Sequence, residues 1–266
     1  MAKETAQSTQ NNATRGALVT GANARLGRAL ALEAAELGYG VIVHFHKDEK
    51  GAQETVALIE SKGRKAHAIS ADLSQMNAIT RLCEEAQSKI GALSCLINNA
   101  SLFEYDRLID MSAQSWQTHL ALNLTAPVFL AQAFAQAFMA REAREDGVIV
   151  NLIDQRVLHL TPEFFSYTIA KAGLWTATQT MAQALSPHIR VNAIGPGPVL
   201  PSARQSAENF ARQAKTTPLG RVVGVEEICG ALRMILQSPS MTGQLIVLDS
   251  GQHLEWRSPI AHGTME

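Results

Sequence analysis

The 266-residue sequence has few cysteines, almost no net charge and no long apolar run. Its three cysteines, Cys83, Cys95 and Cys229, lack CxxC spacing, so they favour buried free thiols in a reducing compartment over a disulfide framework. A formal net charge of -1 excludes the electrostatic footprint of a nucleic-acid-binding protein or a basic membrane-surface protein. Apolar runs fall short of the ~18–20 residues that cross a bilayer.

The first 14 residues are polar and lack the apolar centre of a signal peptide. We interpret residues 1–14 as a disordered tail and the protein as cytoplasmic. Residues 15–266 show no internal boundary, repeat or low-complexity linker, which predicts a single domain.

Short continuous apolar runs alternate with helix-forming segments along this domain. They predict strands at 17–20, 41–43, 67–69, 93–97, 147–153, 189–194 and 244–248. The predicted helices are 28–37, 52–62, 76–90, 115–140 with a kink at Pro127, 166–185 and 226–237. This alternation predicts a Rossmann-like, doubly wound α/β fold with a parallel sheet of about seven strands and helices on both faces. The irregular stretch 195–223 is long enough to be a functional lid or loop.

A glycine-containing turn follows the first predicted strand. Gly21 allows a tight turn, and Gly27, after Leu26, lets the next helix pack closely on the strand. The helix N-terminus then offers unpaired N–H groups and a partial positive charge to a pyrophosphate. Ordinary strand-to-helix packing explains such a turn equally well when it stands alone. Its position at the start of a βαβ unit favours a dinucleotide site.

The end of the second predicted strand carries basic residues where a carboxylate would select a free ribose 2′-hydroxyl. His44, His46 and Lys47 lie there, and Arg25 lies in the neighbouring turn. Cations at this place favour a 2′-phosphate, and therefore NADPH. The alternative is a solvated loop with incidental charge, in which Asp48 weakens the positive field.

Two later strand ends are also predicted to contact the cofactor. Asp72, followed by Leu73, could accept from the adenine amino group, although an aspartate before a helix is also a common N-cap. Asn99 and Ala100 place small and amide groups after the fourth strand, where a simple turn is the alternative.

Tyr167 and Lys171 begin the predicted helix 166–185. Their i, i+4 spacing puts both side chains on one helical face. A free tyrosine has a pKa of about 10. A nearby ammonium favours the phenolate and lowers that pKa, and the same lysine can bond the nicotinamide ribose. The pair therefore predicts a proton donor and its modulator.

Taken together, the motifs resemble the short-chain dehydrogenase/reductase family from about Ala17 to about Gly251. They are Thr20-Gly21…Gly27, Asn98-Asn99-Ala100, Asn123, Tyr167…Lys171 and Pro196-Gly197-Pro198. The resemblance implies an NADP(H)-dependent oxidoreductase in which Tyr167 is the acid, Asn123 holds a relay water, and Pro196 and Gly197 lie at the cofactor. It also implies a homotetramer with the C-terminal segment near a subunit contact.

Two positions depart from the family pattern. Arg25 replaces a glycine, and Asp154 stands where the catalytic serine is expected. An ionised aspartate would repel the alkoxide that forms during ketone reduction. Both departures resemble the pteridine reductase subgroup, which also shows a His-aromatic-His-basic run and Asn-Asn-Ala-Ser followed by an aromatic residue, here Phe103.

The subgroup resemblance implies a pterin site. Phe103 would stack on the pterin ring, Arg25 and Ser101 would bond its polar edge and the cofactor phosphates, and Asp154 with Tyr167 would relay a proton to a ring nitrogen. Alternatively, Phe103 anchors its own loop, and Asp154 caps a strand end or pairs with Arg156.

We therefore predict an NADPH-dependent reductase of a dihydropterin such as dihydromonapterin or dihydrobiopterin. A reductase of another small carbonyl or imine, or a non-catalytic nucleotide-binding protein on the same fold, is the alternative. The histidines His119, His159 and His188 show no metal-ligand grouping, so no metal site is predicted.

Overall fold

The computed structural model describes residues 15–141, 146–201 and 205–255. Seven parallel strands form one sheet in the order β3-β2-β1-β4-β5-β6-β7, which confirms the predicted doubly wound α/β fold. The chain runs outward from β1 to β3 and then crosses back to β4, so the strand order reverses between β1 and β4. The strands are β1 (Gly16–Val19), β2 (Gly40–Phe45), β3 (Ala66–Ser70), β4 (Leu93–Asn98), β5 (Gly147–Leu152), β6 (Ile189–Pro196) and β7 (Leu245–Leu248).

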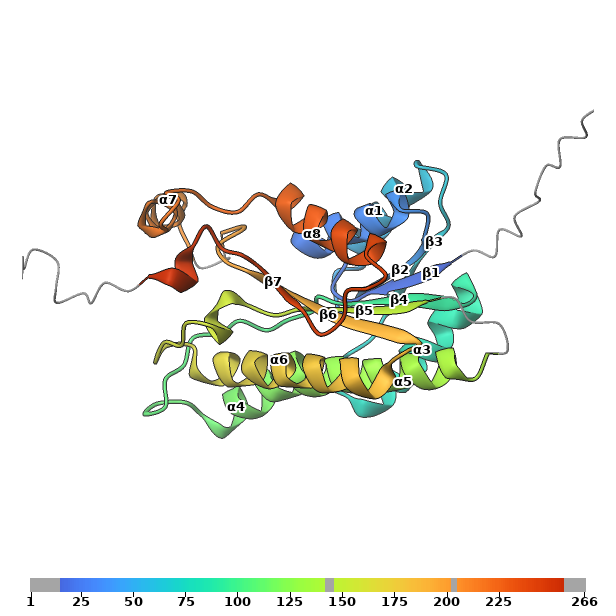
Figure 1. The fold of residues 1–266 in the computed structure, drawn as a ribbon, viewed down its shortest axis with the longest axis horizontal. Helices are drawn as coiled ribbons and strands as arrows, with labels where there is room; N and C mark the ends of the chain where they lie inside the picture. The colour runs from blue at the N-terminus through green and yellow to red at the C-terminus, as the bar shows by residue number, and fades with distance from the viewer. Residues whose placement is uncertain (1–14, 142–145, 202–204, 256–266) are drawn as a thin grey trace, which may run out of the picture.

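Helices cover both faces of the sheet (Figure 1). One layer holds α1 (Arg25–Glu36), α2 (Glu49–Glu60) and α8 (Val225–Gln237). The other holds α3 (Met76–Ile90), α4 (Ala113–Leu120), α5 (Ala126–Met139) and α6 (Phe165–Leu185). Every residue of β1, β2, β4 and β5 is buried, as expected for strands that are covered on both faces.

Residues 113–139 form one long helical run with a π-helical turn, η1 (Ala121–Thr125), between α4 and α5. The interruption is this turn and not a kink at Pro127, which lies in the first turn of α5 where a missing N–H is tolerated. The run has the length and apolar character of a membrane-spanning helix, contrary to the expectation from sequence. However, Leu130, Phe134 and Phe138 are buried in the core cluster that α5 forms with α3 and the sheet, so α5 packs as a core helix.

The segment 195–223 contains more regular structure than the sequence predicted. Its first residues extend β6, and α7 (Ala207–Thr216) follows, N-capped by Ser206. Sequence analysis missed α7 because the helix is short, has Phe210 as its one large apolar residue, and buries none of its residues. The first helix also begins at Arg25 instead of Arg28. The predicted tail at 1–14 and the C-terminal end at 256–266 lie outside the described residues.

The three cysteines are free; Cys83 and Cys95 are buried, whereas Cys229 is only half-buried. Within the described ranges, no group of three or more His, Cys, Asp or Glu side chains is arranged to hold a metal ion.

Candidate active site

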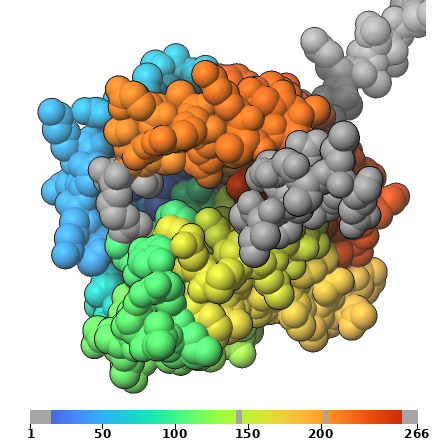
Figure 2. Space-filling model, turned by 90° about the vertical axis from the view of Figure 1, so that its left-hand side faces the viewer, coloured from blue at the N-terminus to red at the C-terminus, as the bar shows by residue number. Residues whose placement is uncertain are grey.

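A cavity of about 730 Å³ lies at the carboxyl end of the sheet. In Figure 2 it appears as a hollow between the orange segment that carries α7 and the green and yellow loops that follow β4 and β5. This place matches the reversal of strand order between β1 and β4, where ligands bind in doubly wound sheets. Ten of the predicted site residues line it: Arg25, Leu26, Asn99, Ser101, Phe103, Asp154, Tyr167, Lys171, Pro196 and Gly197.

The turn after β1 has the geometry of a phosphate-binding turn. Gly21 has a φ of 62°, and a Cβ on Gly27 would lie 2.0 Å from the Gly21 carbonyl oxygen, so only glycine fits there. Helix α1 begins after Ala24 with no described side chain capping it. Its first N–H groups are therefore available to an anion, and the turn fits the pyrophosphate of a dinucleotide.

The segment after β4 holds this turn in place through hydrogen bonds. The Thr20 hydroxyl oxygen accepts from the backbone N–H groups of Asn99 and Ala100, and the Asn99 side chain donates to the carbonyl oxygens of Thr20 and Gly21. At the other wall, the Gly197 N–H donates to the Leu248 carbonyl oxygen. The predicted cofactor segments thus meet around one crevice.

The prediction that His44 is a cation at the ribose phosphate is wrong. Its ring is buried, Nδ1 accepts from the Gly21 N–H, and Nε2 donates to the Ala71 carbonyl oxygen. Burial lowers the His44 pKa to about 4, so the ring is neutral at physiological pH. His44 ties the turn to β2, because it lies within the strand and not beyond its end.

The other residues of the 2′ region differ in exposure. His46 and Lys47 are exposed beyond the end of β2, and the His46 Nε2 lies 3.9 Å from an Asp72 carboxyl oxygen. Asp72 accepts from the backbone N–H and the hydroxyl of Ser74, so its capping role is present. Leu73 is buried in the core cluster beside α3.

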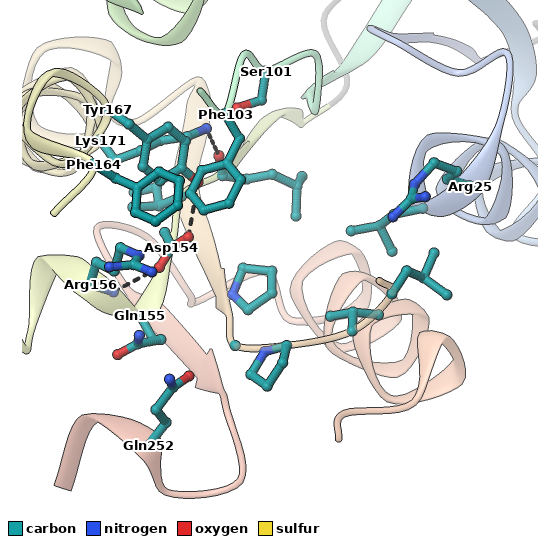
Figure 3. A pocket seen from close by; sticks show the side chains of 18 of the residues that line it. Arg25, Ser101, Phe103, Asp154, Gln155, Arg156, Phe164, Tyr167, Lys171 and Gln252 are labelled. Atoms are coloured by element: carbon teal, nitrogen blue, oxygen red, sulfur yellow. Dashed lines mark hydrogen bonds between the residues drawn. The ribbon is translucent and has the colours of Figure 1, made fainter. Parts of the chain in front are cut away.

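Arg25 crosses from the turn after β1 to the opposite wall. It adopts a φ of 51°, in the left-handed region that favours glycine, at a cost of about 1 kcal/mol. Its guanidinium donates to the Pro201 carbonyl oxygen at 2.7 Å, while the side chain lines the cavity (Figure 3). A strained backbone position that carries a cavity-lining cation points to a ligand contact.

The Tyr167 hydroxyl donates to Asp154 Oδ2 at 2.9 Å. Asp154 follows β5, and its Oδ1 accepts from the Arg156 N–H, so it also caps the short helix η2 (Gln155–Val157). Removal from water raises the Asp154 pKa. Burial and then the neighbouring Asp154 carboxylate hold the Tyr167 pKa well above 10.

The predicted lowering of the Tyr167 pKa by Lys171 is therefore wrong. The Lys171 ammonium lies 5.7 Å from the centre of the tyrosine ring, whereas Asp154 contacts the hydroxyl directly. Lys171 is buried and donates to the Leu152 carbonyl oxygen at 2.7 Å. Burial lowers its pKa to about 8. An ammonium has three N–H donors, so those not used by Leu152 remain for a ribose hydroxyl.

Asn123 lies in the π-helical turn η1 and is fully buried. Its Oδ1 accepts from the Ser101 hydroxyl and the Leu102 N–H, and its Nδ2 donates to the Leu102 carbonyl oxygen. The side chain therefore positions the loop after β4. Its predicted relay water stays a prediction.

Aromatic rings form the cavity wall beside Tyr167. Phe103 meets the Tyr167 ring edge-on with centroids 4.8 Å apart and stacks on Phe164 at 4.2 Å and 6°. The Arg156 guanidinium lies over the Phe164 ring at 4.9 Å. Phe103 thus lies beside Tyr167 in the cavity wall, and its predicted stacking on a pterin ring stays a prediction.

Sequence reasoning missed several wall residues. The Phe-Phe pair immediately before Ser166 and Tyr167 was a local signal for Phe164, whose φ is 54°. Gln155 was signalled only by its place after Asp154. The rest come from segments without a motif: Gln205, Phe210, Gln213 and Gln252.

Known proteins with the same features fall in one family. A family model described as enoyl-(acyl carrier protein) reductase matches residues 21–253. The chain belongs to the short-chain dehydrogenase/reductase family, a class of oxidoreductases.

Two solved structures that are similar to this chain carry the name of a folate enzyme. FolM alternative dihydrofolate reductase 1 from Brucella suis, in complex with NADP, has a TM-score of 0.88 and 42% identity over 93% of this chain and 98% of that chain. The Brucella canis protein, also complexed with NADP, has the same TM-score and identity.

Curated relatives have other substrates in their names. A 3-oxoacyl-[acyl-carrier-protein] reductase from Synechocystis is 31% identical over 88% of this chain and 95% of its own length. A 3beta-hydroxysteroid dehydrogenase from Eggerthella lenta is also 31% identical, over 89% of this chain and 93% of its own length. The relatives belong to one family but differ in the substrates that they are named for, so membership of the family does not fix the substrate of this chain.

Proposed function

We propose that the chain is an NADPH-dependent pteridine reductase that converts a dihydropterin, such as dihydromonapterin or dihydrobiopterin, into its tetrahydro form. The observation that carries this proposal is the hydrogen bond from the Tyr167 hydroxyl to Asp154, where the family has a serine hydroxyl. The 42% identity to two proteins named alternative dihydrofolate reductase supports it, because dihydrofolate contains a dihydropterin ring.

The Asp154–Tyr167 pair suits reduction of C=N better than reduction of C=O. A carbonyl oxygen gains negative charge as it is reduced, and the carboxylate that Asp154 becomes as it gives up its proton would oppose that charge in a poorly solvated cavity. A ring nitrogen instead takes up a proton. The raised pKa of Asp154 favours the protonated carboxyl that such a transfer needs.

NADP(H) is the cofactor, and the chain offers it a matching set of groups. Gly21, Gly27 and the uncapped start of α1 would hold the pyrophosphate, Lys171 the nicotinamide ribose, and His46 with Lys47 the 2′-phosphate. When bound, NADPH supplies the hydride for the ring carbon.

The side chains of this protein then handle the proton and the substrate. Tyr167 donates its hydroxyl proton to the ring nitrogen, and Asp154, in contact with that hydroxyl, returns a proton to it. The aromatic wall of Phe103 and Phe164 packs against the flat ring. Arg25 and Ser101 bind its polar edge.

The deciding experiment follows NADPH consumption with dihydropterins, an acetoacetyl thioester and a reactive diketone. We expect the wild-type protein to prefer a dihydropterin. Preference for the thioester would favour the reading suggested by the 3-oxoacyl-[acyl-carrier-protein] reductase relative. Binding of NADPH without turnover of any substrate would point to a non-catalytic protein.

We also propose a cytoplasmic homotetramer. Phe129 of α5 and Ile169 of α6 expose 38% and 43% of their surface on the helical layer that faces away from the sheet, which is suitable for contact with another copy. Light scattering coupled to gel filtration would give the mass; a monomer at micromolar concentration would contradict the proposal.

A further inference from the structure

One buried polar group at the cavity wall, the side-chain amide of Gln155, takes no part in the proposed hydride and proton transfer. Gln155 follows Asp154 directly and exposes only 5% of its surface. Its amide oxygen is buried and accepts no hydrogen bond from any described residue. An unpaired buried carbonyl costs about 1–3 kcal/mol, so such a group is expected to have a partner when the site is filled.

The surroundings of Gln155 are neutral amides. Gln252, in the short helix η3 (Gln252–Leu254) that contacts η2, lies with Gln155 on the side of the cavity away from Arg25 (Figure 3). Gln205 and Gln213 line the cavity too, and Gln205 Nε2 donates to Gln213 Oε1 at 2.8 Å. These side chains offer donors and acceptors without formal charge.

The cation next to Gln155 in the sequence, Arg156, is directed elsewhere. Arg156 lies over the Phe164 ring and donates to the Thr161 hydroxyl at 2.9 Å. A carboxylate ligand has no donor for the unpaired oxygen of Gln155 and would leave it unsatisfied. A hydroxyl group donates to that oxygen and accepts from an amide N–H at the same time.

We propose that Gln155 and Gln252 form a subsite for a neutral, hydroxylated side chain on the pterin ring. The inference rests on the proposed function, and it names the substrate class of the same site. In a 7,8-dihydropterin the reduced bond joins N5 to C6, and the side chain is attached to C6. The residue that follows Asp154 is therefore next to the atom that carries the side chain. The subsite selects a polyol-bearing dihydropterin over dihydrofolate, whose side chain ends in carboxylates.

The test compares three substrates: 7,8-dihydropterins with a trihydroxypropyl or a methyl group at C6, and dihydrofolate. The wild-type protein should show the highest kcat/KM with the trihydroxypropyl compound. Gln155→Met keeps the length of the side chain and removes the acceptor. It should lower kcat/KM for this compound about tenfold, mainly through KM, and leave the methyl compound within about twofold.

A binding measurement gives a readout apart from turnover. Calorimetry with NADP⁺ present should show about tenfold weaker binding of the oxidised trihydroxypropyl pterin to Gln155→Met, and unchanged binding of 6-methylpterin. Gln252→Met should show a smaller loss of the same selectivity, and provides the test if Gln155→Met fails to fold. Gln244→Met, at an exposed glutamine outside the cavity lining, is the matched control.

The outcomes separate the two proposals. If the wild-type protein reduces no dihydropterin, the proposed function fails and the subsite fails with it. If it reduces the methyl compound or dihydrofolate as well as the polyol compound, only the subsite is wrong. Equal losses on all three substrates in Gln155→Met would also overturn the subsite, since they would indicate a general structural role.

Discussion

The turn after β1 and the segment after β6 face each other across the same cavity but are held in opposite ways. In the turn, Thr20 and Gly21 are bonded by Asn99 and by His44, side chains from two neighbouring strands. In the segment, all residues of α7 are exposed or half-buried. Arg25, through the Pro201 carbonyl oxygen, joins the two.

This difference separates two tasks. The turn has little freedom to vary because Thr20 and Gly21 are already bonded within the fold, so it can serve one constant cofactor. The segment contributes wall residues such as Phe210 and Gln213 with few packing constraints. It can therefore change between family members with different substrates, in line with the range of substrates that the relatives' names contain.

The largest effect should come from Tyr167→Phe, which removes only the hydroxyl group of the proposed proton donor. Turnover should fall by about 10²–10⁴-fold because the proton donor is lost. NADPH affinity, measured by fluorescence titration, should stay near the wild-type value. Near-normal turnover would show that another group donates the proton.

Asp154→Asn should act on the substrate side alone. The amide keeps the shape of the carboxyl but exchanges no proton at neutral pH, so pterin reduction should fall by about 10²-fold with NADPH affinity almost unchanged. Asp154→Ser should not restore pterin reduction, although it should admit weak reduction of activated ketones. Wild-type pterin turnover by Asp154→Ser would contradict a specific role for the carboxyl.

Gly27→Ala tests the turn after β1, on the cofactor side of the cavity. The new Cβ would lie 2.0 Å from the Gly21 carbonyl oxygen, so the turn must move. We expect a loss of about 1–3 kcal/mol in the free energy of unfolding, together with weaker NADPH binding. Gly230→Ala is the matched control, because a Cβ there meets open space within α8. Equal behaviour of the two variants would remove the special role of this turn.

The sequence predicted the sheet and the turn after β1 better than the charges in the site, for a physical reason. Gly21, Gly27 and Asn99 are local signals, since a tight turn and a close helix–strand contact leave few residue choices. The seven strands are apolar runs that burial on both faces requires. These features therefore follow from short stretches of sequence.

The errors fall where tertiary contacts decide. His44 is a cation by residue type, but its burial between β1 and β3 makes it neutral. The pKa of Tyr167 depends on whether Asp154 or Lys171 is closer to its hydroxyl, which the helical spacing alone does not fix. Gln155 and Gln252 are 97 residues apart in the sequence, and the short helices η2 and η3 that carry them come into contact only in the folded chain.

A pH profile should resolve the charge on Lys171. With a pKa of about 8, the lysine is an ammonium below that pH and neutral above it. Turnover should therefore decline up to about tenfold per pH unit above pH 8. Lys171→Arg keeps a cation at all these pH values and should weaken the alkaline decline. An unchanged decline in a folded Lys171→Arg would show that Lys171 is not the group that titrates.

The smallest effect should come from Lys47→Ala, which tests the outer edge of the cofactor side. Lys47 is exposed beyond the end of β2. Because His44 is buried and neutral, Lys47 is the charged side chain that this strand end offers to a ribose phosphate. The variant should bind NADPH about three- to tenfold more weakly at low salt and bind NADH as before. The loss should shrink as salt is added, because exposed charges are screened. Lys65→Ala, at the exposed opposite end of the sheet before β3, should change neither affinity. Titrations of both cofactors at two salt concentrations give the measurement. If NADPH and NADH weaken equally, Lys47 supports the loop and does not read the phosphate, and the choice of cofactor then rests on Arg25 and His46.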